Sequence, residues 1–489
     1  MIKIAKSFLF GGKIRLLVLV LASLAITEPH GRAQTWDTSM CTGSIPSGPF
    51  WNITTVNETN LYVICANGEG TGVFSYNAHD GWVALVDTHW TTMIPSSAIA
   101  ATNNHVYIIG TGVTGGTGHS GLFAWNISTK TWAQLGSDLD EIGATAAVIG
   151  VDNYIYFCNP QNEMTLPNSE SASCVFRYNL AVTNDTGWDN MLGGINMIAE
   201  GNSARAGVYT LEADHDTYTV SGTNYTRTII YIGGQFSGPN DTNHFPFTNY
   251  DVIVFESSAN IGQKYVAVQR GSSAYNGVVN CIAACGDPYP AWSDSFVTKI
   301  MAGQTSAGAK EVIFGGDFED GLDNGGCSST CLGYFGTAQI EKTVSGINNT
   351  YKTASWPSDG PLLSNYYLSG DPCSDLVDTN SQISTATIGG TNRYLFGNFS
   401  KWDGHSVCTG STTGTGAFAQ GTSNIEPAYM LQLTGFSLIY TWPNLIYAMS
   451  RTTDSCGEIY LVGDFDSIDG NTCANIIGFL PNCSAGPPP

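Results

Sequence analysis

Short apolar segments, most of them ending in glycine, recur along the chain and are separated by polar turns. They read LYVICANG at 61–68, HVYIIGTG at 105–112, YIYFCNP at 154–160, IIYIGGQFSG at 229–238, VIFGGDFEDG at 312–321, YLFGNFSKWDG at 394–404 and IYLVGDFDSIDG at 459–470. Runs rich in β-branched and aromatic residues, bounded by Gly, Asn and Asp, predict strands and turns. In the last four segments the glycine begins a G-x-F turn, where it fits a backbone that bends or is approached closely, and we expect the Phe of each G-x-F to pack between layers.

A second strand type follows each of these segments. It reads GVFSYN at 72–77, GLFAWN at 121–126, CVFRYN at 174–179, DVIVFE at 251–256, CLGYFG at 331–336, YMLQLT at 429–434 and NIIGFL at 475–480. Apolar residues alternate with small or polar ones in these segments, as expected for strands. In the first three repeats a tryptophan follows, at Trp82, Trp132 and Trp188. The paired repeats predict an all-β chain of successive antiparallel sheets.

The order of the strands predicts how the ends of the chain meet. The strand NIIGFL near the C-terminus has no further strand after it, and the first glycine-ending strand has no second-type strand before it. The two ends therefore complement each other, which is typical of a β-propeller that leaves no sheet edge unpaired. We expect a single seven-bladed β-propeller over residues 34–484, with a flexible Pro-rich tail at 485–489. The alternatives are an array of β-sandwiches or two separate β domains.

The repeats resemble those of a known class. The G-x-F turn, the Gly/Asp/Asn loop after it and the N-I-I strand resemble kelch-like and delta-60-type propeller repeats of extracellular proteins, and GLFAWNISTKTWAQLG at 121–136 is similar to the outer half of a kelch blade. The resemblance covers most of 60–480, at the level of repeats only. It implies a propeller fold and no particular activity.

The composition and the N-terminal segment predict that the protein is exported. Only 12% of residues are charged, with 18 Lys+Arg against 40 Asp+Glu and a net charge of −22, so a nucleic-acid partner is not expected. Basic residues precede the apolar run at 16–26, and Gly31 and Ala33 place small residues before a cleavage point. Residues 1–33 are therefore predicted to be a signal peptide, with an uncleaved anchor helix as the alternative. No second apolar run could span a membrane, so we expect a secreted, extracellular or cell-surface protein.

Thirteen cysteines in an exported chain predict disulfides. The repeat register predicts the pairs Cys373–Cys408, Cys456–Cys473, Cys158–Cys174 and Cys41–Cys483, and two bonds among Cys281, Cys285, Cys327 and Cys331. Cys65, in the apolar strand LYVIC, is expected to be a buried thiol outside the disulfide network. Sequence alone does not fix connectivity.

Candidate sites for chemistry are few. Nine sequons predict N-glycosylation, at Asn52, Asn57, Asn126, Asn184, Asn224, Asn240, Asn348, Asn398 and Asn482. Two acidic turns could bind Ca²⁺, one with Asp464, Asp466 and Asp469 and the other with Asp317, Glu319 and Asp323, although Asp is common in tight turns for local hydrogen bonding. No catalytic motif is present, and no cofactor other than Ca²⁺ is expected. A pair of catalytic carboxylates, as in glycosidases, remains an alternative.

These features lead to a function hypothesis and two alternatives. The first hypothesis is a non-catalytic, glycosylated structural or adhesive subunit of an extracellular matrix, coat or fibril, which associates with itself or with other extracellular proteins and glycans. The second is a lectin-like propeller that stacks sugars on Trp82, Trp132 and Trp402, residues that could equally pack between blades. The third is a glycoside hydrolase or oxidase on the propeller face.

Overall fold

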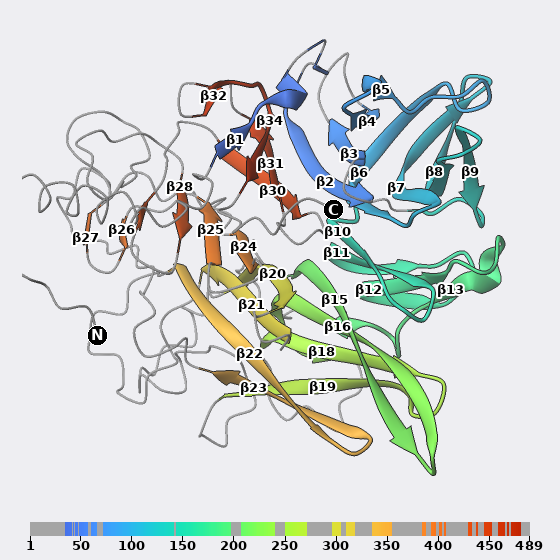
Figure 1. The fold of residues 1–489 in the computed structure, drawn as a ribbon. Coiled ribbons are helices and arrows are strands. Elements are labelled where there is room, and N and C mark those ends of the chain that lie inside the picture. The colour runs from blue at the N-terminus through green and yellow to red at the C-terminus, as the bar shows by residue number, and fades with distance from the viewer. Residues whose placement is uncertain are drawn as a thin grey trace, which may run out of the picture.

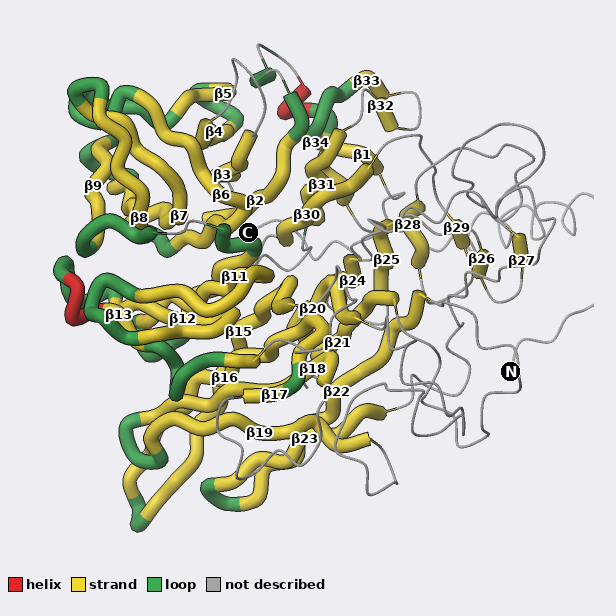
Figure 2. The backbone as a smooth tube through the Cα atoms, turned by 180° about the vertical axis from the view of Figure 1, so that it is seen from behind, coloured by secondary structure: helices red, strands yellow, loops and turns green. Residues whose placement is uncertain are grey.

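The computed structural model describes the chain in segments. These are residues 35–196 apart from 42, 44, 47, 57–59, 66–71 and 141–142, then 207–239, 250–270, 296–304, 310–317 and 335–354, and finally 384–387, 393–397, 401–402, 405–406, 429–432, 437–438, 445–451, 458–464, 467–468 and 471–480. The elements in these segments are strands apart from two short 3₁₀ turns, η1 (Ser39–Cys41) and η3 (Asp185–Gly187) (Figure 2). The prediction of an all-β chain is confirmed.

Three four-stranded antiparallel sheets follow one another from residue 50. They consist of β2 (Phe50–Val56), β3 (Asn60–Cys65), β4 (Gly72–Asn77) and β5 (Gly81–Ala84); β6 (Thr92–Ala101), β7 (His105–Thr114), β8 (Thr117–Asn126) and β9 (Thr131–Leu135); and β10 (Ala146–Ile149), β11 (Tyr154–Thr165), β12 (Ser171–Asn179) and β13 (Trp188–Asp189). In each sheet the strands pair in chain order. The two repeated sequence types are the second and third strands of each sheet.

The next eight strands form one continuous sheet. Its members are β15 (Gly207–Val220), β16 (Thr223–Phe236), β18 (Tyr250–Ser258), β19 (Gly262–Arg270), β20 (Phe296–Gln304), β21 (Lys310–Asp317), β22 (Phe335–Ser345) and β23 (Asn348–Ala354). Each half repeats the four-stranded meander. The halves join where β19 pairs with β23 in parallel, with Val268 opposite Tyr351. This edge-to-edge pairing leaves neither fourth strand as an open edge.

The last two four-stranded sheets bring distant parts of the chain together. One contains β24 (Ser384–Thr387), β25 (Arg393–Gly397), β28 (Tyr429–Gln432) and β29 (Ser437–Leu438), and the other contains β30 (Leu445–Arg451), β31 (Ile459–Asp464), β34 (Ile476–Leu480) and β1 (Thr35–Asp37). Two-stranded pairs complete the described elements: β14 (Ile195–Asn196) with β17 (Gly238–Pro239), β26 (Lys401–Trp402) with β27 (His405–Ser406), and β32 (Ser467–Ile468) with β33 (Asn471–Thr472). β1 pairs antiparallel with β34, with Trp36 opposite Phe479.

One edge strand of each four-stranded sheet, and both edge strands of the eight-stranded sheet, lie at the centre of the molecule. Contacts run in series from β30 through β2, β6, β10, β15, β20 and β24 and return to β30. Figure 1 shows the sheets fanning outward from these inner strands, with β5, β9 and β13 at the periphery. Consecutive sheets therefore meet face to face beside their inner strands.

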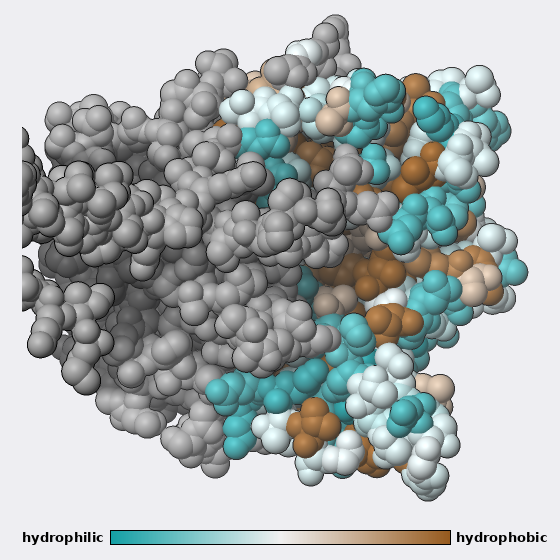
Figure 3. Space-filling view, viewed as in Figure 1, coloured by the Kyte–Doolittle hydropathy of each residue, from teal (hydrophilic) through white to brown (hydrophobic). Residues whose placement is uncertain are grey.

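The core consists of apolar layers between neighbouring sheets. One layer joins β31 and β34 to β2 and β3, the next joins the β2–β5 sheet to the β6–β9 sheet, and further layers continue through β10–β13, β15–β19 and β20–β23. Phe236, the aromatic residue of the first G-x-F, is fully buried in one of these layers, as the sequence predicted. On the face seen in Figure 3, apolar surface shows over β10 and β11, where Val148 and Ile149 are half-buried.

The strand-ending glycines are explained by bulges in the inner strands. In β6 the register with β7 shifts between Pro95 and Ile99, and in β15 the register with β16 shifts between Val208 and Thr210. A Cβ on Gly110 would overlap the carbonyl of Ile94, and one on Gly234 would overlap the carbonyl of Gly207. Both positions therefore require glycine because the bulged backbone approaches closely.

Candidate functional site

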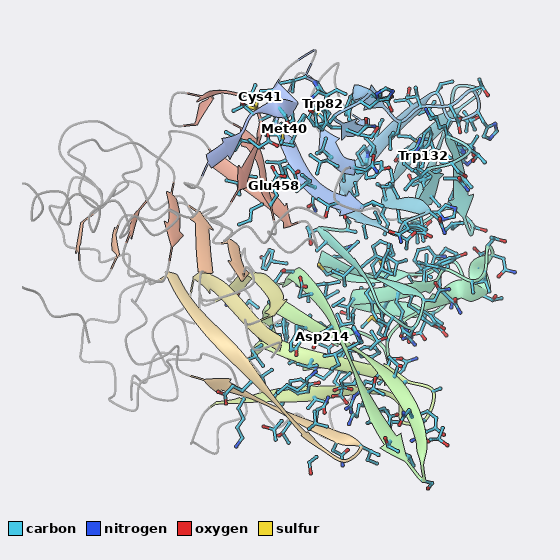
Figure 4. All side chains as sticks on the ribbon, in the orientation of Figure 1. Met40, Cys41, Trp82, Trp132, Asp214 and Glu458 are labelled. Atoms are coloured by element: carbon cyan, nitrogen blue, oxygen red, sulfur yellow. A yellow bond between two sulfur atoms is a disulfide. The ribbon has the colours of Figure 1, made fainter. Side chains whose placement is uncertain are left out.

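The repeated tryptophans join neighbouring sheets. Trp132 in β9 is 5% exposed, and its indole nitrogen donates to the carbonyl of Leu85, directly after β5, at 2.7 Å. Trp82 in β5 does the same one sheet earlier, donating to the carbonyl of Met40, after β1, at 2.9 Å. Figure 4 shows Trp82 beside Met40. These two tryptophans are packing residues, and the idea that they stack sugars is not supported. The side chain of Trp402 lies outside the described residues.

An aspartate reinforces one of these joints. Asp87, which follows β5, accepts hydrogen bonds from the backbone nitrogens of His89 and Trp90 through Oδ1, and from the backbone nitrogen of Trp132 through Oδ2 at 2.7 Å. One carboxylate therefore shapes its own turn and binds the fourth strand of the next sheet.

A disulfide links the two ends of the described chain. It joins Cys41, in η1 after β1, to Cys473, just before β34, across 432 residues. Figure 4 shows Cys41 next to Met40. This bond corrects the predicted pairs Cys41–Cys483 and Cys456–Cys473. The register argument failed because it placed Cys473 with a cysteine of its own repeat, whereas the turn before β34 faces the segment after β1.

Three further described cysteines carry buried thiols: Cys65, Cys158 and Cys174. The predicted Cys158–Cys174 bond is therefore not present. Burial raises the pKa of the Cys65 thiol, and likewise that of Cys174, to about 11. A thiol with so high a pKa is a weak nucleophile at neutral pH. Outside the described residues lie Cys281, Cys285, Cys327, Cys331, Cys373, Cys408, Cys456 and Cys483, whose predicted bonds stay predictions.

The proposed calcium turns fall almost entirely outside the described residues. Asp317 and Asp464 are the last residues of β21 and β31, and only their backbone is described. Outside the described residues lie Glu319, Asp323, Asp466 and Asp469. Calcium binding at these turns stays a prediction.

The sequons fall into three groups. Asn184, Asn224 and Asn348 are exposed, the last two beside the turns of the β15–β16 and β22–β23 hairpins. Asn126 is half-buried and its side chain closes the β8–β9 turn by accepting from the nitrogens of Ser128 and Thr129. Asn52 is half-buried in the inner strand β2. Outside the described residues lie Asn57, Asn240, Asn398 and Asn482.

The deepest charged cluster lies within the eight-stranded sheet and is centred on Arg227 in β16. The side chain of Arg227 is fully buried and binds Asp216 through Nε at 2.9 Å and Glu256 through Nη1 at 3.2 Å. It also donates to the side chain of Asn349 at 2.9 Å and to the carbonyl of Ile347 at 2.9 Å, both on the β22–β23 hairpin. One guanidinium thus joins the two halves of the sheet.

Lysines complete the charge balance of this cluster. Lys342 lies 3.2 Å from Asp214 and 3.4 Å from Asp216, and Lys264 lies 3.1 Å from Glu256. Three cations therefore face three carboxylates. Despite burial, the hydrogen bonds from Arg227 and Asn349 hold the pKa of Asp216 below its usual value. Burial, and then the nearby carboxylate of Glu256, raise the pKa of Tyr351, whose hydroxyl donates to Glu256 at 2.6 Å.

A smaller cluster lies between the β10–β13 sheet and the eight-stranded sheet. Arg177 in β12, with a side chain 4% exposed, binds Asp189 at 2.9 Å and Asp152 at 3.4 Å, and its guanidinium lies 4.0 Å from the ring centre of Tyr154. It also donates to the hydroxyl of Ser257, in β18, at 3.1 Å. Burial alone would lower the pKa of Arg177, but the contacts with Tyr156 and Asp189 raise it.

The described charges of the Arg227 cluster pair with one another, three cations against three carboxylates. In the Arg177 cluster one cation faces two carboxylates, and the buried Asp152 Oδ1 and Arg177 Nε have no hydrogen-bond partner among the described residues. Sequence reasoning missed both clusters. The only sequence signal was Asp214 and Asp216, which alternate in β15 and so share one face of the strand.

The described segments contain no candidate metal centre and no candidate membrane-spanning helix. No group of three or more His, Cys, Asp or Glu side chains there could hold a metal ion. Among the same residues, no helix is long and apolar enough to cross a membrane.

Comparisons with known proteins add little. No family model matches the chain, and no curated protein matches it in sequence. Solved structures that resemble it are propeller-like β-sheet proteins. One is YCF48 bound to D1 peptide, with a TM-score of 0.39 and 9% identity over 89% of this chain and 92% of that chain. A second is the polysaccharide lyase Uly1, with a TM-score of 0.37 and 10% identity over 90% of this chain and 91% of that chain. A third is the GH43 BlXynB protein from Bacillus licheniformis, with a TM-score of 0.25 and 12% identity over 89% of this chain and 85% of that chain. At these TM-scores the likenesses carry no argument about function, and nothing in them supports kelch-like repeats specifically.

Proposed function

We propose that the chain is a seven-bladed β-propeller whose ring is closed by its own two ends. The proposal is supported by the series of contacts among the inner strands, which returns to β30, and by the pairing of β1 with β34. In this interpretation the eight-stranded sheet is two blades that have joined at their outer edges. A closed ring would account for the apolar layers between neighbouring sheets in the described part of the chain.

We further propose that the protein is a secreted, non-catalytic structural or adhesive subunit of an extracellular assembly. The observation that carries the proposal is the Cys41–Cys473 bond, which fastens the segment after β1 to the turn before β34. Such bonds persist in oxidising compartments outside the cytosol.

Electron microscopy of the full-length protein, expressed with its N-terminal segment and recovered from the medium, tests this proposal. We expect ordered filaments or lattices, and we expect the Cys41→Ser/Cys473→Ser variant to form fewer of them. The proposal fails if the protein stays monomeric at every concentration and also turns over a polysaccharide substrate. Retention of the protein inside the cell would refute secretion independently.

A further inference from the structure

The β15–β16 hairpin projects beyond the rest of its sheet. β15 and β16 pair with each other out to Val220 and Thr223, whereas the pairing of β16 with β18 begins only at Thr228. Figure 1 shows this hairpin extending outward at the lower end of the molecule. β15 is the last strand of the eight-stranded sheet on its side. Within the described part of the chain, residues 217–220 therefore pair with β16 alone, and one edge of β15 is open there.

This open edge lacks the usual protection against pairing with other chains. Natural proteins commonly protect an edge strand with charged side chains, with proline or by keeping the strand very short. Residues 217–226 contain no charged residue and no proline. The outer strands β5, β9 and β13 have only four, five and two residues, whereas β15 has 14. The projecting end of β15 is therefore better suited than these strands to pair with another chain.

Exposed apolar side chains lie beside the hairpin. Lys342 in β22 binds Asp214 in β15, and Val344, two residues further along β22, lies on the same face of that strand. Val344 is 51% exposed, and Ile347, in the turn between β22 and β23, is 42% exposed. The carbonyl of Ile347 accepts a hydrogen bond from Arg227 in β16. The β22–β23 turn therefore lies against the β15–β16 hairpin and adds apolar surface to it.

The distribution of charge indicates which partner can cover this surface. The chain has a net charge of −22, so two copies repel each other over most of their surfaces. Residues 217–226 and 343–350 carry no charge, so two copies can approach here without that local repulsion. An open edge also complements itself, because antiparallel edges related by a two-fold axis exchange the same backbone hydrogen bonds. These features favour a second copy of this chain over a basic partner, which would be drawn to acidic surface instead.

We propose that two copies of the protein associate through the projecting end of β15. Residues 217–220 pair antiparallel with the same residues of the second copy, which places Thr219 beside the two-fold axis and close to its own equivalent. Val344 and Ile347 add apolar contact next to the paired edges. The inference rests on the proposed function, because it names one contact of the proposed extracellular assembly.

The sequon at Asn224 is compatible with this contact. Asn224 lies in β16, opposite Thr219, and so on the strand away from the open edge of β15. The next residue, Tyr225, stacks on Tyr218 with 5.8 Å between ring centres, on the other face of the hairpin. A glycan on Asn224 therefore extends from one face of the hairpin and leaves the edge of β15 accessible.

Sedimentation velocity of the full-length secreted protein over a range of concentrations tests the proposal. We expect the parent to dimerise, and we expect Thr219→Lys and Thr219→Glu each to stay monomeric where the parent is dimeric, because like charges meet at the axis. An equimolar mixture of these two variants should dimerise again, because opposite charges then meet. Val344→Ala should weaken the dimer by about tenfold. Val151→Ala, at an apolar residue that is 52% exposed between β10 and β11, is the control and should dimerise as the parent does.

Several outcomes would overturn the proposal. They are a secreted parent that stays monomeric at every concentration, Thr219→Lys or Thr219→Glu that dimerises alone as the parent does, a mixture of the two that stays monomeric, or equal effects of Val344→Ala and Val151→Ala. Thermal unfolding of each variant separates lost association from lost folding. Thr219→Val, which adds no charge, should dimerise as the parent does.

Electron microscopy separates this inference from the proposed function. Filaments or lattices that persist in Thr219→Lys would overturn the β15 contact and leave the proposed assembly standing. Dimers of the parent that never form filaments or lattices would support the β15 contact and count against the proposed assembly.

Discussion

The sheets from β2 to β9 and the eight-stranded sheet from β15 to β23 solve the same packing problem in different ways. The first two junctions between neighbouring sheets are apolar and are reinforced by Trp82 and Trp132, whose indoles donate to the preceding sheet. The eight-stranded sheet holds Arg227, Asp216 and Glu256 in its interior and is joined edge to edge through β19 and β23. Although only 12% of the residues are charged, several charged side chains are buried inside the eight-stranded sheet.

This comparison shows which interactions stabilise each kind of junction. An indole buried among apolar residues contributes mainly through removed apolar surface, with one hydrogen bond to fix its orientation. A buried arginine contributes little net energy compared with an apolar side chain, but its removal leaves carboxylates without a partner. The charged region should therefore be the more sensitive to loss of a single side chain and to pH.

The largest effect is expected from Arg227→Met. Because Asp216 and Glu256 would lose their shared cation, the free energy of unfolding should fall by about 3–5 kcal/mol. Hydrogen exchange should locate the loss in β15–β23. Lys352→Met, at an exposed cation of β23, is the control and should change little. Equal loss in both variants would show that Arg227 has no special role.

The Cys41→Ser/Cys473→Ser double variant should have the next largest effect. Loss of the cross-link should lower stability by about 3 kcal/mol, as measured by thermal unfolding without reductant. Reductant should lower the melting temperature of the parent more than that of the variant, which keeps the cysteines whose bonds stay predictions. Cys65→Ser, at a buried thiol, is the comparison, and it should not abolish the response to reductant. A variant as stable as the parent would argue against a stabilising cross-link.

Trp132→Phe tests the apolar junction. The indole hydrogen bond to Leu85 would be lost and a buried carbonyl left without its donor, which should cost about 2 kcal/mol. Trp51→Phe makes the same chemical change at an exposed position and should cost far less. Denaturant unfolding compares the two variants. A similar cost at both positions would remove the distinction between the buried sheet junction and the exposed position of Trp51.

The smallest expected effect is on how stability depends on pH, through the carboxyl group of Asp216. The pKa of Asp216 is lowered in the folded protein, so its contribution to stability is fully present above the usual value of 3.8 and is lost as the pH falls through the lowered pKa. The parent should therefore be more stable than Asp216→Asn near pH 7, and the difference should narrow below about pH 4. Asp138→Asn, at an exposed carboxyl in the loop after β9, is the control. A difference that does not change with pH would contradict the assignment.

Much of the strand pattern could be predicted from the sequence, and the reason lies in local sterics. The glycine at 234 indicated close backbone approach, and the structure shows the bulge that requires it. Trp82 and Trp132 make the same indole hydrogen bond to the preceding sheet, whereas the buried indole nitrogen of Trp188 has no hydrogen-bond partner in the described part of the chain. The tryptophans could not be assigned from sequence, since a packing residue and a sugar-stacking residue look the same there.

By itself the sequence determined that this chain is all-β, where its paired strand types lie and which positions exclude a side chain, because alternation and glycine act within a few residues. Only the tertiary structure decided that Cys41 bonds to Cys473, that Arg227 joins two hairpins and that Trp51 stays exposed. Each of these depends on which distant segments meet and in what register. Local patterns do not encode that choice, because it is set by the packing of whole sheets against one another.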